Sequence, residues 1–212
     1  MRGSADMNVL LFLANGFETM EARKNMPRYT AQNTAILSKS ERKKRMIKVM
    51  FVCHGNICRS PMAEFVLKDM VEKMGIMDEF EIASAATSTE EIWRGNGNPI
   101  YPPAQAELRK RGIGKTAYTN FASKRARQIT REDYDHYDYI LCADQMNILN
   151  TKRITGEDKD NKIKLLLDFS ESIKRRGRSI SDPWYSGQFD VTYDDIYDGC
   201  TGLIKALLKD RS

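Results

Sequence analysis

Short apolar segments alternate with segments of helical character along most of this chain. Four segments are mostly apolar without helical spacing, as expected of strands that are buried on both faces: residues 47–52, 80–85, 139–143 and 163–167. Helical spacing and capping residues predict helices at residues 61–74, 103–111, 131–136, 145–151 and 192–209. Strands that alternate with helices predict an α/β fold, here a doubly wound, four-stranded parallel sheet with helices on both faces.

The first predicted strand leads into a loop that organises the rest of the chain. Residues 53–60 form this short loop, and Pro61 then begins a helical pattern in the first turn, where proline is tolerated. The N–H groups at such a helix start have no intrahelical partner, and the helix dipole favours negative charge beside them. Ligands of parallel sheets bind beyond the carboxyl ends of the strands, where this loop lies. The segment therefore predicts an anion site.

The loop carries a thiol and a guanidinium at a spacing that suits phosphate chemistry. Cys53 is followed by five residues and then by Arg59. A thiol at a helix N-terminus near an arginine favours the thiolate, which is the nucleophilic form, and a guanidinium holds two phosphate oxygens side by side. The hydroxyl of Ser60 can donate to this thiolate, and Ser60 is also a good helix N-cap. We therefore predict a nucleophile and a phosphate clamp within one loop.

The composition is that of a soluble globular protein. The chain has 212 residues, of which 41% are hydrophobic and 30% charged, and its net charge is +5. No apolar run approaches the roughly 20 residues that span a bilayer, and neither a signal peptide nor a nucleic-acid motif is evident, so we expect no membrane or nucleic-acid partner. Four irregularly spaced cysteines and two histidines predict neither a disulfide framework nor a metal site, and they favour a reduced, cytoplasmic setting.

The segment CHGNICRSPMAE, residues 53–64, resembles the signature loop of the low-molecular-weight protein tyrosine phosphatases. The resemblance extends from Met46 to the C-terminus and continues in the family's order at SAATS (84–88), ARQIT (126–130), DYILCAD (138–144) and DPW (182–184). It implies a metal-independent phosphatase without a cofactor, which hydrolyses phosphotyrosine in proteins and small aryl phosphates through a phosphocysteine intermediate. It also predicts that residues 46–212 form the phosphatase domain.

The resemblance implies a role for each residue of the site. Cys53 attacks phosphorus, Arg59 and the N–H groups of residues 54–59 hold the phosphate oxygens, and Asp182 is the general acid and later the base. Without the resemblance, Asp182-Pro183 reads as a turn. The residues expected to bind phosphate or to support the loop are His54, Gly55, Asn56, Ile57, Cys58, Ser60 and Ser84.

Two residues of the loop invite more detailed predictions. Asn56 stands where a tight loop needs a residue in the left-handed conformation, and the resemblance implies Ser84 as its hydrogen-bond partner. Cys58 is either a small buried residue or, as in the family, a partner that forms a disulfide with Cys53 on oxidation. His54 adjoins the nucleophile, but neighbours in a loop usually point apart, so we interpret it as structural.

Aromatic residues are the candidates for the walls of the cleft. A phenyl leaving group stacks well between aromatic rings, and a deep aromatic slot favours phosphotyrosine because the shorter phosphoserine cannot reach the nucleophile from its rim. Core packing is the alternative interpretation of each ring. The predicted cleft residues are Trp93, Trp184 and Tyr185.

Departures from the family pattern leave three alternative functions open. Phosphoarginine phosphatases tend to carry Thr where this chain has Ile57, which favours phosphotyrosine. Arsenate reductases of this fold use a further pair of cysteines, and Cys142 and Cys200 are too far apart in the sequence to form one, so we interpret both as core residues. The third alternative is a regulator that binds phosphate without catalysis. Lys124 stands where relatives often carry His, which leaves the structural role of that residue in doubt.

Residues 1–45 lie outside this resemblance and form a predicted N-terminal extension. They begin with MRGS, which is typical of an expression-vector leader, and continue with a strand-like segment at residues 8–14 and a basic linker. Residues 8–24 weakly resemble the opening strand and turn of the DJ-1/PfpI family, with Glu18 as that family's glutamate. Because the apolar segment would be exposed, we predict that it adds to a sheet edge and allows self-association.

Overall fold

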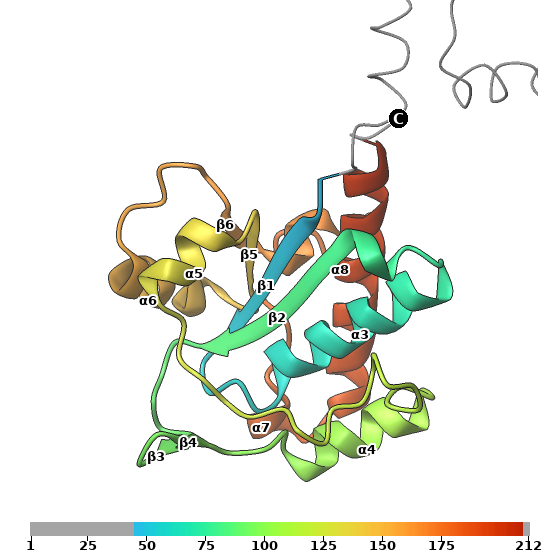
Figure 1. Ribbon diagram of the computed structural model, residues 1–212. Helices are drawn as coiled ribbons and strands as arrows, with labels where there is room; N and C mark the ends of the chain where they lie inside the picture. Colours follow the sequence, from blue (N-terminus) through green and yellow to red (C-terminus); the bar gives the residue numbers. More distant parts are fainter. Residues whose placement is uncertain (1–44, 210–212) are drawn as a thin grey trace, which may run out of the picture. The chain divides into compact units, whose positions relative to one another are not determined.

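The computed structural model describes residues 45–209, and a four-stranded parallel sheet forms their centre (Figure 1). The strands lie in the order β2-β1-β5-β6, and Cys53 at the end of the first strand is opposite Ala86. Their bounds are β1 (Ile47–Cys53), β2 (Phe80–Ala86), β5 (Tyr139–Cys142) and β6 (Ile163–Leu165). The predicted sheet is thus confirmed, whereas the predictions for residues 1–44, Glu18 and self-association included, lie outside the described residues.

Helices cover both faces of this sheet, as predicted. In Figure 1, α3 (Arg59–Lys73), α4 (Pro102–Lys110) and α8 (Phe189–Lys209) lie on one side, and α5 (Arg131–His136) and α6 (Gln145–Thr155) lie on the other. The sequence did not predict the smaller elements: the 3-10 helices η2 (Met77–Glu79) and η3 (Leu166–Phe169), the hairpin of β3 (Ile92–Trp93) and β4 (Asn96–Gly97), and the short helix α7 (Pro183–Ser186).

Local capping explains where two of the helices begin. The Thr130 hydroxyl accepts the N–H of Asp133, whose carboxylate accepts the N–H of Thr130 in return, so a reciprocal capping box starts α5. Asp144 caps α6 by accepting the N–H of Asn147 at 2.7 Å. Helix α6 runs further than predicted and ends at Thr155. Its C-cap is Gly156, whose φ of 90° lies in the left-handed region.

The fourth strand is shorter than predicted because the chain turns at its end. The Asp168 carboxylate accepts the N–H of Leu165 at 3.0 Å, and this contact draws the chain into η3. Helix α8 packs directly on that turn. A Cβ atom on Gly202 would lie 1.8 Å from the carbonyl oxygen of Phe169, so only glycine fits at this crossing.

The first strand is buried on both faces and separates two apolar clusters. Val49 and Phe51 belong to the larger cluster, which α3 and α8 cover, while Met50 and Val52 belong to the cluster under α5 and α6. Burial on both faces is the arrangement from which the strand was predicted, and it anchors the loop that follows. Within residues 45–209, no helix is long and apolar enough to cross a membrane.

Candidate active site

The loop after β1 lies where the winding of the sheet reverses. β1 and β5 are adjacent, and the helices that follow them, α3 and α6, lie on opposite faces of the sheet (Figure 1). In doubly wound sheets this switch point opens a crevice beyond the carboxyl ends of the strands. Residues 54–58 connect β1 to α3 at this point, where the sequence predicted an anion site.

Helix α3 begins at Arg59, earlier than the sequence predicted. Cys58 occupies the N-cap position, and no side chain caps this end of the helix. The prediction of Ser60 as the N-cap is therefore wrong, because Ser60 lies inside the first turn and its hydroxyl faces Cys53. The N–H groups of the uncapped turn stay available to an anion.

The Cys53 sulfur is buried and has two polar neighbours. Ser60 Oγ lies 3.0 Å from Sγ, and the backbone N–H of Asn56 donates to Sγ at 3.3 Å. Donors at these positions stabilise a negative charge on the sulfur. The structure thus places Ser60 against the candidate nucleophile, as predicted.

The Arg59 guanidinium is buried and bridges two carboxylates. One terminal nitrogen lies 2.7 Å from Asp144 Oδ2, and the other lies 2.6 Å from Asp182 Oδ2. Burial alone would lower the pKa of Arg59, but Cys53, Asp182 and Asp144 together raise that pKa above its ordinary value. The side chain is therefore a firmly held cation beside the candidate nucleophile.

Asp144 is a site residue that the sequence analysis missed. One of its oxygens caps the helix that follows, α6, and its second oxygen contacts Arg59. A signal was present in the sequence, because Asp144 directly follows the third strand. Side chains in that position gather at the carboxyl edge of a parallel sheet.

Asp182 combines the two interpretations that the sequence allowed. One carboxylate oxygen accepts the N–H of Trp184 at 3.1 Å and so caps the short helix α7, which accounts for the Asp-Pro turn. The other oxygen faces Arg59. The carboxyl group is partly exposed in the cleft, where a leaving group would arrive.

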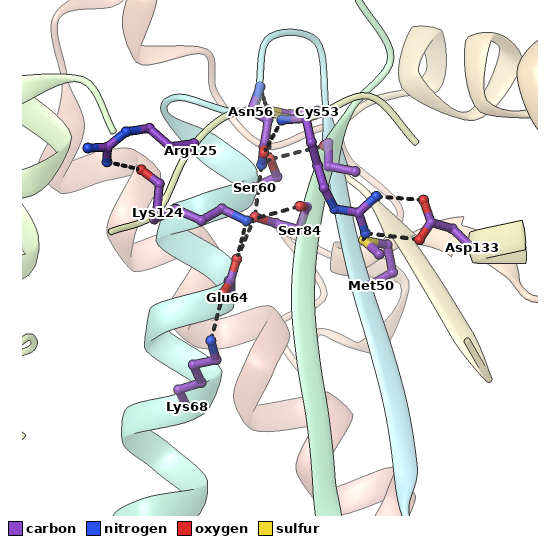
Figure 2. Close-up of polar contacts among 12 residues, drawn as sticks. Met50, Cys53, Asn56, Ser60, Glu64, Lys68, Ser84, Lys124, Arg125 and Asp133 are labelled. Atoms are coloured by element: carbon purple, nitrogen blue, oxygen red, sulfur yellow. Dashed lines mark hydrogen bonds and ion pairs between the residues drawn. The ribbon is translucent and has the colours of Figure 1, made fainter. Parts of the chain in front are cut away.

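Asn56 belongs to the loop, and its side chain contacts Ser60 and Ser84 (Figure 2). Its φ of 57° lies in the left-handed region, as predicted. Its side-chain amide donates to Ser84 Oγ at 2.8 Å and to Ser60 Oγ at 2.9 Å. Lys124, whose role the sequence left in doubt, donates to the Ser84 carbonyl oxygen and pairs with Glu64, a residue that the sequence analysis did not single out.

A cleft of about 360 Å³ opens above the loop and contains the three candidate catalytic residues. Trp184 and Tyr185 line it, and the Trp184 ring packs against Tyr101 with 5.2 Å between the ring centroids. Trp93 does not belong to the cleft wall. It lies on the hairpin of β3 and β4, next to a tight turn in which Arg94 and Gly95 have positive φ, and it is 74% exposed.

Comparison with known proteins agrees with this geometry. Residues 48–212 match the family model described as low molecular weight phosphotyrosine protein phosphatase. The chain belongs to this phosphatase family. The low molecular weight protein-tyrosine-phosphatase YfkJ of Bacillus subtilis is 36% identical over 166 residues, which cover 78% of this chain and 99% of YfkJ. The low molecular weight phosphotyrosine protein phosphatase of Gallus gallus is 37% identical, with 76% of this chain and 93% of the relative covered.

Solved structures lead to the same family. The crystal structure of YfkJ superimposes with a TM-score of 0.70 at 35% identity, covering 80% of this chain and 99% of that one. SP-PTP, the low molecular weight protein tyrosine phosphatase of Streptococcus pyogenes, gives a TM-score of 0.62 at 38% identity, covering 76% and 93%. The predicted family and fold are confirmed.

In this phosphatase-family chain, several residues that the sequence analysis did not single out also line the cleft. They are Glu90, Glu91, Met146, Asn147 and Asn150. His54 Nε2 lies 2.9 Å from Glu90 Oε2 at the exposed rim, so it takes part in a surface pair. Glu90 and Glu91 lie in the loop before β3, and Met146, Asn147 and Asn150 lie in α6, so no local pattern in the sequence marked them as cleft residues.

The second thiol of the phosphatase loop differs from the first in its surroundings. Cys58 is buried among Ile57 and Ala126, and burial, followed by the charges of Cys53 and Asp182, raises the pKa of Cys58 to about 12. It is therefore protonated at neutral pH. Cys142 and Cys200 are buried in the core, as predicted. No group of His, Cys, Asp and Glu in the described part of the chain is arranged to hold a metal ion.

A second hollow, of about 420 Å³, lies at the opposite end of the sheet. It is lined by residues at the amino ends of the strands, Ile47 and Tyr139 among them, and by the pair that Arg45 forms with Asp138 at 2.6 Å. Although it is the larger hollow, it contains none of the predicted site residues. Its walls offer neither a thiol nor a switch point, so the smaller cleft is the candidate active site.

Proposed function

We propose that this protein is a metal-independent protein-tyrosine phosphatase that hydrolyses phosphotyrosine in proteins and small aryl phosphates. The observation that carries the proposal is the convergence of Cys53, Arg59 and Asp182 in one cleft at the start of α3. A nucleophile, a cation for the phosphate and a proton donor for the leaving group are the parts that this reaction needs. Residues 46–212 are proposed as the phosphatase domain.

Substrate binding begins with an exchange of partners at Arg59. In the free protein the guanidinium faces two carboxylates, and a phosphate dianion presents the same geometry of paired oxygens. The phosphate therefore replaces Asp182 at one edge of the guanidinium, while Asp144 keeps hold of the other. This exchange frees the Asp182 carboxyl group to turn toward the ester oxygen.

The chemical reaction then takes two steps. The Cys53 thiolate forms a bond to phosphorus as the bond from phosphorus to the aryl oxygen breaks, and Asp182 gives its proton to that oxygen. In the second step, Asp182 takes a proton from water, the water oxygen bonds to phosphorus and the sulfur–phosphorus bond breaks. Inorganic phosphate and the Cys53 thiolate result. Arg59 and the N–H groups of the first turn stabilise the charge of the phosphoryl oxygens in both steps.

The rim of the cleft favours an aryl substrate, and the free thiols favour a reducing compartment. Trp184 and Tyr185 present flat apolar surfaces beside the candidate acid, and a phenyl ring stacks against such surfaces. All four cysteines are free thiols in the structure, and the proposed mechanism requires Cys53 in that state. A cytoplasmic setting is therefore part of the proposal.

Hydrolysis of p-nitrophenyl phosphate, a phosphotyrosine peptide and phosphoarginine, measured with a chelator present, tests the proposed function. We expect turnover of the two aryl substrates, none by Cys53→Ser, and a decrease in kcat by a factor of about 10² to 10⁴ for Asp182→Ala. Asp160→Ala, which removes an exposed carboxylate outside the cleft, is the matched control and should behave like the wild type. A preference for phosphoarginine would overturn the substrate assignment, and full activity of Cys53→Ser would overturn the mechanism.

A further inference from the structure

The candidate acid lies at the end of a long irregular connection. Residues 170–182 join η3 to α7 without a helix or strand of their own, and Asp182 is the last of them. Connections of this kind are ordinarily the more mobile parts of a fold. Because a displacement of about 1 Å at a catalytic site can lower the rate by a factor of about 10², this connection needs anchors close to Asp182.

Two anchors hold the residues directly before Asp182. The N–H of Ile180, a buried residue, donates to the carbonyl oxygen of Ala143 just after β5, with 2.8 Å between nitrogen and oxygen. The carbonyl oxygen of Ser181 accepts the hydroxyl of Thr192 in α8 at 2.9 Å. Thr192 is fully buried, so this contact is shielded from water. The chain is thereby fixed to the sheet and to α8 immediately before the acid.

Asp195 provides a third anchor, one helical turn after Thr192 on the same face of α8. Its oxygen Oδ2 accepts the N–H of Ser181 in a longer contact of 3.5 Å. Both polar groups of the Ser181 backbone are therefore held by α8. The Asp195 side chain is only 3% exposed, and a carboxylate buried to this extent is costly unless cations accompany it.

Two arginines of the connection supply the cations for Asp195. Its other oxygen, Oδ1, lies 3.1 Å from Arg175 Nε and 3.4 Å from Arg178 Nη2. Gly177 turns the chain between the two arginines with a φ of 73°, in the left-handed region. Removing one partner from such a cluster is costly, because it leaves a buried charge unpaired. The connection is thus held on α8 by its own side chains.

We propose that Asp195 is a positioning residue for the candidate acid: together with its arginine partners it holds the end of the connection on α8, so that the Asp182 side chain turns from Arg59 to the leaving oxygen about a fixed backbone. This inference rests on the proposed function. Asp195 does not line the cleft and acts through the backbone of Ser181. Its contribution therefore concerns the protonation of the leaving group and not the binding of phosphate.

The test compares two substrates whose leaving groups differ in their need for a proton. Phenolate leaves poorly unless it is protonated, whereas 2,4-dinitrophenolate is stable as an anion and leaves without an acid. Asp195→Asn keeps the size of the side chain but removes its charge. We expect kcat/KM for phenyl phosphate to fall about 10-fold, a part of the roughly 10² to 10⁴ that general acid catalysis contributes. The kcat/KM for 2,4-dinitrophenyl phosphate should change little.

A double-mutant cycle shows whether Asp195 acts through Asp182. Asp182→Ala alone should lower kcat/KM for phenyl phosphate much more than for the dinitrophenyl ester. Adding Asp195→Asn to Asp182→Ala should cause no further loss for either substrate, because the group that it positions is already absent. Amide hydrogen exchange at Ser181 measures the anchor itself, and this exchange should be faster in Asp195→Asn than in the wild type.

Glu107→Gln is the matched control. Glu107 is 7% exposed and, like Asp195, contacts two cations, Arg111 at 2.8 Å and Lys110 at 3.5 Å. These residues belong to α4 and the residue after it, outside the connection that carries the acid. The loss of this carboxylate should lower the melting temperature without changing the ratio of the two kcat/KM values or the exchange at Ser181.

The arginine partners provide a second test if Asp195→Asn does not fold. The double variant Arg175→Met/Arg178→Met alters positions that are more exposed than Asp195, and it should show the same selective loss for phenyl phosphate. A wild-type ratio of the two kcat/KM values in the folded variant would overturn the inference, as would equal losses for both substrates or unchanged exchange at Ser181. No turnover of either substrate by the wild type would overturn the proposed function, and this inference with it.

Discussion

The floor and the rim of the cleft are built in opposite ways. The floor consists of the Asn56 side chain in the loop and of four residues beneath it, Ser60, Glu64, Ser84 and Lys124. Each of these side chains has at least one partner among the others. The rim, formed by His54, Glu90, Trp184 and Tyr185, is mostly exposed, and Tyr185 is 87% exposed. A buried polar group without a partner is costly, which disfavours rearrangement of the floor, whereas the exposed side chains of the rim carry no such penalty.

This difference assigns separate tasks to the two regions. The floor holds the loop and Cys53 in the geometry that the chemical steps need, so changes there should appear in kcat. The rim contacts the part of the substrate that does not react, so changes there should appear mainly in KM. The predictions that follow test this division.

Of the substitutions that follow, Asp144→Asn is expected to have the largest effect, because Asp144 lines the cleft and contacts Arg59. Asp144→Asn keeps a side chain that caps α6, but it removes the charge that holds one edge of Arg59. We expect kcat for p-nitrophenyl phosphate to fall about 10-fold because Arg59 loses its fixed orientation. KM should not rise, since a negative charge near the phosphate is lost as well. Steady-state kinetics measures kcat and KM, and thermal melting checks that the cap of α6 is retained.

Asp158→Asn is the control for Asp144. Asp158 is a buried carboxylate whose oxygens accept the N–H groups of Lys162 and Ile163 at 3.0 and 3.2 Å, remote from the cleft. Its substitution should lower the melting temperature and leave kcat unchanged. A raised KM with unchanged kcat for Asp144→Asn would show that Asp144 acts on binding alone.

The sequence predicted the parts of this site that depend on neighbouring residues better than the contacts between residues far apart in the chain. The strand, loop and helix that carry Cys53 and Arg59 are local patterns, and the resemblance added Asp182. The cap that Asp144 provides is also local, but its contact with Arg59 joins residues 85 positions apart, which no periodicity reveals. Glu64 reads as an ordinary polar residue of an amphipathic helix until the fold brings Lys124 beside it.

The rim was the part that the sequence predicted least well. An aromatic residue in a loop carries no sign of the direction in which it points. Trp184 and Tyr185 lie in α7 and line the cleft, while Trp93 lies in the β3–β4 hairpin and does not. Loop geometry decided these outcomes, and it depends on elements too short to predict from periodicity.

A second prediction concerns the acid stability that the floor contributes. Burial alone would raise the pKa of Glu64, but Lys124 and Lys68 lower it in the folded protein, so just below the ordinary value the unfolded chain binds a proton that the folded protein does not. Stability from this group is complete above the ordinary pKa and is lost as pH falls through the folded value. One such proton corresponds to a slope of about 1.4 kcal/mol per pH unit. Urea unfolding of Glu64→Gln should therefore show a shallower decrease in stability with acid than the wild type.

The stability measured at acid pH shows whether the Glu64 carboxyl group is charged or neutral in the folded protein. Parallel stability curves for Glu64→Gln and the wild type below the ordinary pKa would mean that Glu64 is already protonated in the folded protein. The carboxyl group could then donate a hydrogen bond to Ser84. Glu107→Gln provides the comparison for a buried glutamate outside the site.

The smallest effect is expected at the rim, where the two tryptophans form a natural pair of variants. Trp184 lines the cleft and packs against Tyr101, whereas Trp93 lies outside it. Trp184→Ala should raise KM for a phosphotyrosine peptide by a factor of about 3 to 10, as expected for the loss of one aromatic contact, and kcat should change less. Trp93→Ala should leave both constants unchanged, because Trp93 is not among the residues that line the cleft.

An inhibitor without an aromatic ring provides a control for the comparison of the two tryptophans. Inorganic phosphate, as a competitive inhibitor, would occupy the loop beside Arg59 but has no ring to stack on the rim, so its inhibition constant should be the same in Trp184→Ala and the wild type. If Trp184→Ala weakened phosphate binding as much as peptide binding, the ring would act on the loop through Asp182, whose carboxylate caps the helix that carries it. The rim and the floor would then not act independently. A substitution at Trp184 would change kcat and KM together.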